Sequence, residues 1–157
     1  MNDVVIRKAT NRDINGIVDV LKSIYLQDEA WAKDALQKLL ATEDYFILVA
    51  ELNGVVIGFI DFYVLPSLYE KWNEATINNF FVHRSYQNKG VGSKILAEAV
   101  KQADEMGLGE FSVVTEKDNQ RAKKLYNKHG FVKEYLVLQR TKEIEQFSFA
   151  YLNTFVA

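Results

Sequence analysis

The dipeptide Asn53-Gly54 constrains the fold of this chain more than any other short segment. Both residues tolerate the positive φ angles of a type I′ turn, the tightest connection between two antiparallel strands. On either side lie residues 45–52 and 55–64, which are dense in β-branched and aromatic side chains. The sequence therefore predicts a β-hairpin over these two segments.

Hydrophobic periodicity predicts both helices and strands around this hairpin, which makes the fold class mixed α/β. Thr10 stands three residues ahead of Asp13, close to a capping box, where apolar residues begin to recur at helical spacing. Helices are expected over residues 14–25, 29–40, 91–107 and 119–129, and further strands over 4–8, 75–83, 111–115, 131–140 and 146–152. Antiparallel strands come first and a strand–helix–strand unit follows, so we expect one domain over residues 1–157.

Composition excludes several classes of function. The chain has no cysteine and only two histidines, which excludes disulfides, thiolate metal sites, a cysteine nucleophile and a histidine-rich metal cluster. A formal charge of -2 gives no reason to expect nucleic acid as a partner. No segment approaches the roughly 20 apolar residues that span a membrane, and the N-terminus lacks a signal-peptide core. We expect a soluble, cytoplasmic protein without a membrane partner.

The segment "QNKGVG", residues 87–92, lies between a predicted strand and a predicted helix. The first backbone N–H groups of a helix lack partners, and glycines let a phosphate approach them closely. Ser93 adds a hydroxyl there, and Lys89 and Lys94 add positive charge. An ordinary tight turn explains the same spacing. A P-loop is disfavoured because the longer Gly-x4-Gly-Lys-Ser/Thr pattern is missing.

A second motif, "NQRAKKLYNKHGF", occupies residues 119–131. Asn119, Ala122 and Tyr126 fall on one face of the predicted helix, which suits a helix that lines a ligand channel. The alternative is structural, with Tyr126 a core aromatic residue whose hydroxyl reaches the rim and Asn119 a helix-start residue.

Together, residues 82–92 and 119–131 resemble the GNAT superfamily of acyl-coenzyme A-dependent N-acetyltransferases. The two motifs cover roughly a third of the chain, and the element order and length of the remainder are similar to that fold. The stretch "INNFFVHRSYQNKGVGSKIL" particularly resembles diamine and thialysine acetyltransferases. The resemblance implies a mostly antiparallel central sheet with a β-α-β cofactor unit. It also implies acetyl transfer from acetyl-coenzyme A to a primary amine by direct attack in a ternary complex, without a metal.

The resemblance also implies roles for individual residues. The strand before the glycine loop would splay from its neighbour and pair its backbone with the pantetheine arm. Asn119 would hydrogen-bond the coenzyme, and Tyr126 would be the general acid that protonates the departing thiolate. The residues of the strand and loop expected to bind the cofactor are Phe81, Val82, Gln87, Asn88, Lys89, Gly90, Val91, Gly92 and Ser93.

No residue of this chain matches the general base that the resemblance implies, because the nearer relatives carry a glutamate where this chain has Asn78. An amide cannot accept a proton as a base; at best it orients a water molecule. The alternatives are a water relay, another carboxylate such as Asp61 or Glu116, or a substrate amine of low pKa.

The missing glutamate leaves a second class of function open, a GNAT-like domain that binds acyl-coenzyme A as a sensor without turnover. If the chain is an enzyme, a small-molecule amine is favoured as acceptor over a protein or peptide amine. The aromatic segment over residues 147–155 is interpreted as a final strand, with a homodimer interface as a secondary interpretation.

Overall fold

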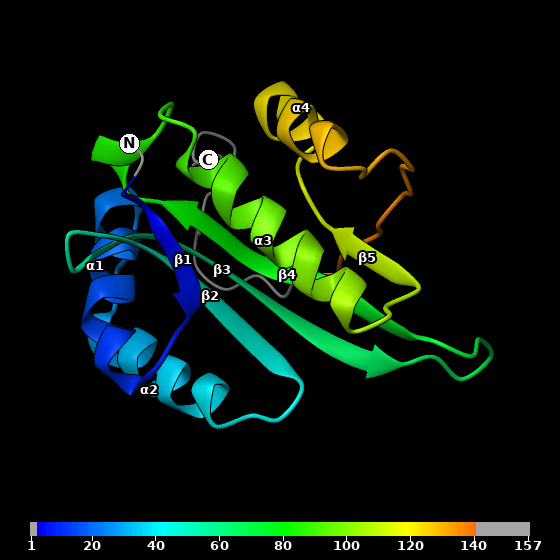
Figure 1. Ribbon diagram of the computed structural model, residues 1–157, viewed down its shortest axis with the longest axis horizontal. Coiled ribbons are helices and arrows are strands. Elements are labelled where there is room, and N and C mark those ends of the chain that lie inside the picture. Colours follow the sequence, from blue (N-terminus) through cyan, green and yellow to red (C-terminus); the bar gives the residue numbers. More distant parts are fainter. Residues whose placement is uncertain (1–2, 141–157) are drawn as a thin grey trace.

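The computed structural model describes residues 3–140 (Figure 1). The predicted order of helices and strands is confirmed from residue 5 to residue 128. The elements are β1 (Val5–Lys8), η1 (Asn11–Asp13), α1 (Ile14–Ile24), α2 (Glu29–Leu40), β2 (Tyr45–Leu52), β3 (Val55–Pro66), β4 (Asn73–Val82), η2 (Arg84–Tyr86), α3 (Val91–Glu105), β5 (Glu110–Val113) and α4 (Gln120–Lys128), where η marks a single 3₁₀ turn.

The described strands form one mixed sheet in the order β1-β2-β3-β4-β5. Neighbours are antiparallel from β1 to β4, whereas β4 and β5 are parallel because α3 connects them. The hairpin prediction is confirmed, since Asn53 (φ 51°) and Gly54 (φ 80°) both adopt the left-handed region that a type I′ turn requires.

Helices cover both faces of the sheet, with α1 and α2 on one side and α3 on the other (Figure 1). Because side chains alternate along a strand, β3 contributes to two cores. Phe59 packs in the cluster that contains Ile17 of α1 and Leu36 of α2. Ile60 packs in the opposite cluster, which includes Ile95 of α3. The long hairpin strand is therefore the shared wall between the two cores.

The prediction of a strand over residues 131–140 is wrong. This segment follows α4 without regular structure, and most of its apolar side chains are exposed, among them Val132 and Leu136. A segment of β-forming residues becomes a strand only where a neighbouring strand shares its hydrogen bonds, and this segment pairs with none of the described strands. The predicted strand at 146–152 and the aromatic segment at 147–155 lie outside the described residues.

None of the helices in residues 3–140 combines the length and the apolar character that crossing a membrane demands. The same residues contain no group of three His, Asp or Glu side chains arranged to hold a metal ion.

A clamp of charged residues ties the start of the chain to the first helix. Arg7 of β1 donates two hydrogen bonds to Asp13, from Nη1 to Oδ2 at 2.8 Å and from Nη2 to Oδ1 at 2.7 Å. Its Nε donates to Glu51 of β2 at 2.9 Å. Asp13 also accepts from the backbone N–H of Thr10 at 2.8 Å, as the predicted capping box requires. The hydrogen bonds from Arg7 lower the pKa of the buried Asp13 carboxyl to about 2.

We predict that replacing Asp13 with asparagine removes much of the acid sensitivity of folding. The folded-state pKa of Asp13, about 2, lies below its ordinary value of 3.8. The clamp therefore stabilises the chain fully above about pH 5, and that stability is lost as the pH falls toward 2. Its contribution is about 2 kcal/mol. Urea unfolding of wild type and Asp13→Asn between pH 2 and pH 7 measures the free energy of unfolding and its dependence on pH.

The matched control is Asp34→Asn, because Asp34 is exposed and pairs only with Lys38 one helical turn away. An exposed pair of this kind contributes little, so this variant should keep the wild-type pH dependence. Equal pH dependence in wild type and Asp13→Asn would contradict the prediction.

Candidate active site

The strand β4 changes its pairing on both sides at Asn78. Toward β3, the register runs from Phe62↔Ile77 to Asp61↔Asn79, so Asn78 is the extra residue of a β-bulge. Toward β5, pairing ends at Ile77↔Val113. From Asn78 to the end of β4, the edge that faces away from β3 therefore meets no described strand. The two strands fork at the bulge.

The predicted glycine loop follows this open edge and leads into α3. Asn88 (φ 60°) and Gly90 (φ 79°) are both left-handed, and Gly90 is the N-cap of the helix. Gln87 donates from Nε2 to the carbonyl oxygen of Val82 at 3.1 Å, which fastens the loop to the end of β4. Lys89 donates from Nζ to the carbonyl oxygen of Ser85 at 2.9 Å. The side chains of the loop thus hold its own shape, while α3 begins with backbone N–H groups that lack intrahelical acceptors.

Helix α4 buries the stripe that its sequence predicts. The exposed fractions of Asn119, Ala122 and Tyr126 are 8%, 0% and 4%. Asn119 is the N-cap, with its Oδ1 accepting from the N–H of Ala122 at 3.0 Å, which is the helix-start role considered as the alternative. The ring centroids of Tyr126 and of Phe80 on β4 lie 6.4 Å apart. Burial raises the pKa of its phenol, so the hydroxyl stays protonated at neutral pH.

A hydrogen bond connects the two helices that flank the open edge. The hydroxyl of Ser93, in the first turn of α3, lies 2.9 Å from Nε2 of His129, the C-cap of α4. Partial burial lowers the pKa of His129, which favours the neutral ring. The predicted cofactor residue Ser93 therefore also sets the spacing between α3 and α4.

A buried carboxylate lies beside the fork, on the face of the sheet that α1 and α2 cover. Asp61 of β3 is only 1% exposed. It accepts hydrogen bonds from the Tyr45 hydroxyl (Oδ1, 2.8 Å), the Asn79 N–H (Oδ1, 3.0 Å) and Asn79 Nδ2 (Oδ2, 2.9 Å). Burial raises its pKa to about 6, although these hydrogen bonds oppose the change. Glu116, the other carboxylate considered from the sequence, is exposed.

The bulge brings Asn78 to the same network. Side chains of consecutive residues in a regular strand point to opposite faces. Here both Asn78 and Asn79 reach the Tyr45–Asp61 pair, because Asn78 donates from Nδ2 to the Tyr45 hydroxyl at 3.1 Å. That Asn78 orients a water molecule stays a prediction, and the hydrogen bond that its side chain makes in the structure is to a phenol.

Sequence reasoning named Asp61 only as one alternative and missed Tyr45. One signal was available, since Asp61 is the single charged residue between Val55 and Val64, in a strand of otherwise apolar side chains. A charge at such a position must be paired or neutralised when it is buried. Its partner Tyr45 looks like an ordinary strand aromatic in the sequence.

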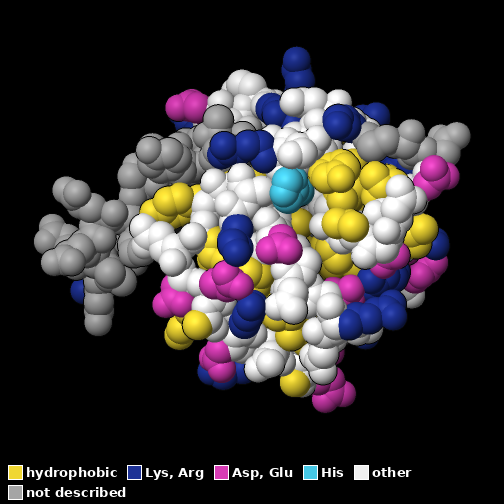
Figure 2. All heavy atoms as spheres, turned by 90° about the vertical axis from the view of Figure 1, so that its left-hand side faces the viewer, with side chains coloured by type: hydrophobic (Ala, Val, Ile, Leu, Met, Phe, Trp, Pro, Cys, Tyr) yellow, Lys and Arg dark blue, Asp and Glu magenta, His cyan; other side chains and the backbone are white. Residues whose placement is uncertain are grey.

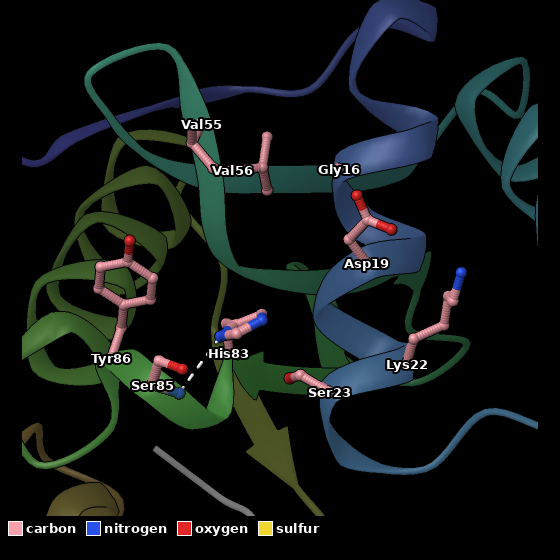
Figure 3. Close-up of a pocket in the computed structure, with 9 residues that line it drawn as sticks. All are labelled: Gly16, Asp19, Lys22, Ser23, Val55, Val56, His83, Ser85 and Tyr86. Carbon is pink, nitrogen blue, oxygen red and sulfur yellow. Dashed lines mark hydrogen bonds between the residues drawn. The ribbon is translucent and has the colours of Figure 1, made fainter.

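A separate cavity of about 590 Å³ lies between α1, the β2–β3 turn and η2 (Figure 3). Its polar side chains include Asp19, Lys22 and Ser23 of α1 and His83. His83 caps η2, its Nδ1 accepting from the Ser85 N–H at 3.2 Å. Figure 2 shows the face of the molecule that carries α1, with an exposed histidine and interspersed acidic and basic side chains. The lining residues of this cavity include no member of the predicted cofactor site.

The fork, the glycine loop and the α4 stripe are the features implied by the resemblance to coenzyme A-dependent N-acetyltransferases. A sequence profile of the Acetyltransferase (GNAT) family matches residues 14–131. The chain therefore belongs to this family, and it is an acetyl-coenzyme A-dependent N-acetyltransferase, as the sequence predicts. The resemblance drawn from the two motifs is confirmed.

Individual proteins show the same relationship. YhfO of Bacillus subtilis, an uncharacterized N-acetyltransferase, is 30% identical over 131 residues, which cover 80% of this chain and 88% of that protein. The L-amino acid N-acyltransferase MnaT of Escherichia coli is 32% identical over 88 residues, covering 56% of this chain and 51% of MnaT. The structure of an aminoglycoside acetyltransferase from an uncultured soil sample superposes with a TM-score of 0.75 at 22% identity, covering 92% and 98% of the two chains. This last similarity shows the fold.

Proposed function

We propose that this chain transfers an acetyl group from acetyl-coenzyme A to the primary amine of a small molecule, by direct attack in a ternary complex. The observation that carries the proposal is the fork, because its open edge runs from Asn78 to the start of the glycine loop, with buried Tyr126 packed against Phe80 on the same strand. Membership of the GNAT family supports the donor. The name of MnaT supports a small amine as acceptor.

The described residues fit coenzyme A. The open edge of β4 at Val82 offers backbone groups to the amide-containing pantetheine arm. Phe81, the other residue predicted there, turns its backbone N–H and C=O toward Phe59 of β3. The unpartnered N–H groups at the start of α3 suit a pyrophosphate, and open space beside Gly90 lets it approach. Ser93 lies in the same turn. Acetyl-coenzyme A supplies an acetyl thioester that the amine attacks, with the coenzyme A thiolate as leaving group.

Tyr126 is the group of this chain that we assign to the leaving thiolate. Its phenol is protonated at neutral pH because it is buried, so it has a proton to donate. Its place on α4, across from β4, puts the hydroxyl on the side of the fork opposite the Tyr45–Asp61 network, since Phe80 and Asn79 point to opposite faces of the sheet.

We predict that Gly90→Ala weakens the binding of acetyl-coenzyme A by about three- to tenfold. A Cβ at Gly90 meets no atom within 4 Å, so the whole effect comes from strain at φ 79° and the resulting shift of the α3 N-terminus. Gly54→Ala is the matched control, because Gly54 has φ 80° and equally open space. Both substitutions should cost about 1 kcal/mol of stability. Calorimetric titration should show weaker binding only for Gly90→Ala; equal affinities would contradict the loop assignment.

We expect acetyl-coenzyme A, and not ATP, to raise the melting temperature of the wild-type chain. A ligand at 100 times its Kd stabilises a fold by about 2.7 kcal/mol. A thiol-release assay over polyamines, amino acids, aminoglycosides and peptides then identifies the acceptor class. Turnover restricted to peptides would overturn the small-molecule acceptor. Tight binding with no turnover on any amine would favour the sensor function instead, and stabilisation by ATP alone would falsify the donor assignment.

For Tyr126→Phe we expect a fall in kcat of about 100-fold with little change in the Kd of acetyl-coenzyme A, because the substitution removes the proton and keeps the packing of the ring. Tyr135→Phe is the control, since Tyr135 is 78% exposed. Steady-state kinetics and calorimetry measure the two quantities. Unchanged kcat in Tyr126→Phe would remove the acid role.

A further inference from the structure

Asp61 has no role in the function proposed so far, yet its position is unusual. A carboxylate buried in a sheet is costly unless it is hydrogen-bonded, and Asp61 uses Tyr45 and Asn79 for that purpose. Apolar residues of α1 and α2 pack on this face of the sheet, where Phe59 is the next residue of β3 on the same side. No Lys, Arg or His of the described chain forms an ion pair with it. The charge is thus held by neutral donors only.

The Tyr45 hydroxyl connects this buried carboxylate to the fork. It donates its proton to Asp61 Oδ1, and the side-chain amides of Asn78 (Nδ2, 3.1 Å) and Asn79 donate to it. An ammonium group donates hydrogen bonds as an amide N–H does, so it can replace Asn78 Nδ2 on the phenolic oxygen. Asn78 is exposed and Tyr45 is half-buried, so this replaceable bond lies at the surface end of the network. The Oδ1 atom of Asn78 is a second acceptor at the same place.

We propose that Tyr45 and Asp61 form the proton relay that activates the amine, with Asn78 orienting the Tyr45 hydroxyl. This inference rests on the proposed function and names the groups that replace the missing glutamate. Tyr45 is the residue that contacts the substrate ammonium, and Asp61 acts through it. The site is therefore suited to a cationic primary amine, which donates hydrogen bonds to Tyr45 Oη and Asn78 Oδ1.

The substrate nitrogen loses two protons in the reaction. One N–H proton of the ammonium passes to Tyr45 Oη while the Tyr45 proton passes to Asp61 Oδ1, leaving a neutral amine and a neutral acid. The nitrogen then forms its bond to the acetyl carbon as the carbon–sulfur bond breaks. The second proton that the nitrogen loses ends on the sulfur, by way of Tyr126. Asp61 returns its proton to solvent through Tyr45 before the next turnover.

The titration properties of the network agree with this assignment. Burial and the negative charge of Asp61 raise the pKa of Tyr45, so Tyr45 passes a proton on without remaining a phenolate. Burial raises the pKa of Asp61 to about 6, which brings it closer to that of an amine than an ordinary carboxyl. Tyr45 from β2 and Asn79 from β4 are the groups that hydrogen-bond Asp61, and no charged group of the described residues contributes to its pKa.

The alternative is structural, in which Asp61 only fastens the bulge of β4. A pair of matched amines separates the two roles. The first is the best basic amine from the panel. The second is its analogue with three fluorine atoms on the carbon next to the amine-bearing carbon, which leaves the nitrogen mostly unprotonated at neutral pH. The relay is needed only for the first, whereas damage to the bulge affects both amines equally.

The test uses Tyr45→Phe and Asp61→Asn in the full chain, with Tyr63→Phe as control, because Tyr63 lies opposite Tyr45 in the β2–β3 register and is not a hydrogen-bond partner of Asp61. We expect kcat/KM for the basic amine to fall about 100-fold in Tyr45→Phe and to change less than about threefold for the analogue. In a plot of kcat/KM against pH, the wild-type chain should lose activity below about pH 6, and this loss should be absent in Asp61→Asn. Tyr45→Phe keeps the result informative if Asp61→Asn fails to fold.

A second readout needs no turnover. Carboxyl ¹³C NMR of the chain without ligands should show Asp61 titrating near pH 6 in wild type and at higher pH in Tyr45→Phe, since the Tyr45 hydrogen bond lowers the Asp61 pKa. The relay would be overturned if the variants lost kcat/KM equally for the two amines, or if Tyr45→Phe left the pKa of Asp61 unchanged. Either result would leave the acetyltransferase function intact. Absence of wild-type turnover with both amines would overturn the proposed function and the relay together.

Discussion

The separation of β4 from β5 after Ile77 is the constraint on which the candidate active site depends. Up to that residue the two strands are hydrogen-bonded in parallel, and beyond it β4 continues alone to Val82. The backbone groups along that edge need partners, as any buried polar group does. Gln87 satisfies one of them, the Val82 carbonyl. The others form the open edge between α3 and α4, the two helices that the Ser93–His129 hydrogen bond holds together.

The bulge at Asn78 gives this fork a second face. Because it interrupts the alternation of β4, two consecutive amides reach the Tyr45–Asp61 pair. One surface of the strand therefore offers buried acceptors for a proton, and the other lies against the buried phenol of Tyr126. An amine acetyltransferase needs both, since the nitrogen loses protons while the leaving sulfur gains one. We infer that the two faces of β4 divide these tasks.

Much of the fold was predictable because its signals are local. The left-handed turn at Asn53-Gly54, the boundaries of α2 and the stop of α4 at Gly130 follow from the preferences of a few neighbouring residues. The segment at 131–140 is rich in apolar residues, as many strands are, but no described strand pairs with it. A strand is defined by its partner, so pattern alone predicted it wrongly.

The sequence by itself determined the order of the elements, the family and the positions of the glycine loop and the Asn119–Tyr126 stripe, because these depend on spacing within single segments. Only the tertiary structure decided that Asp61 is buried beside Asn78 and linked to it through Tyr45. These three residues come from three strands, and the register between strands is set by the whole sheet. The relay that we propose in place of the missing glutamate therefore consists of neighbours in space that are up to 33 residues apart in the chain.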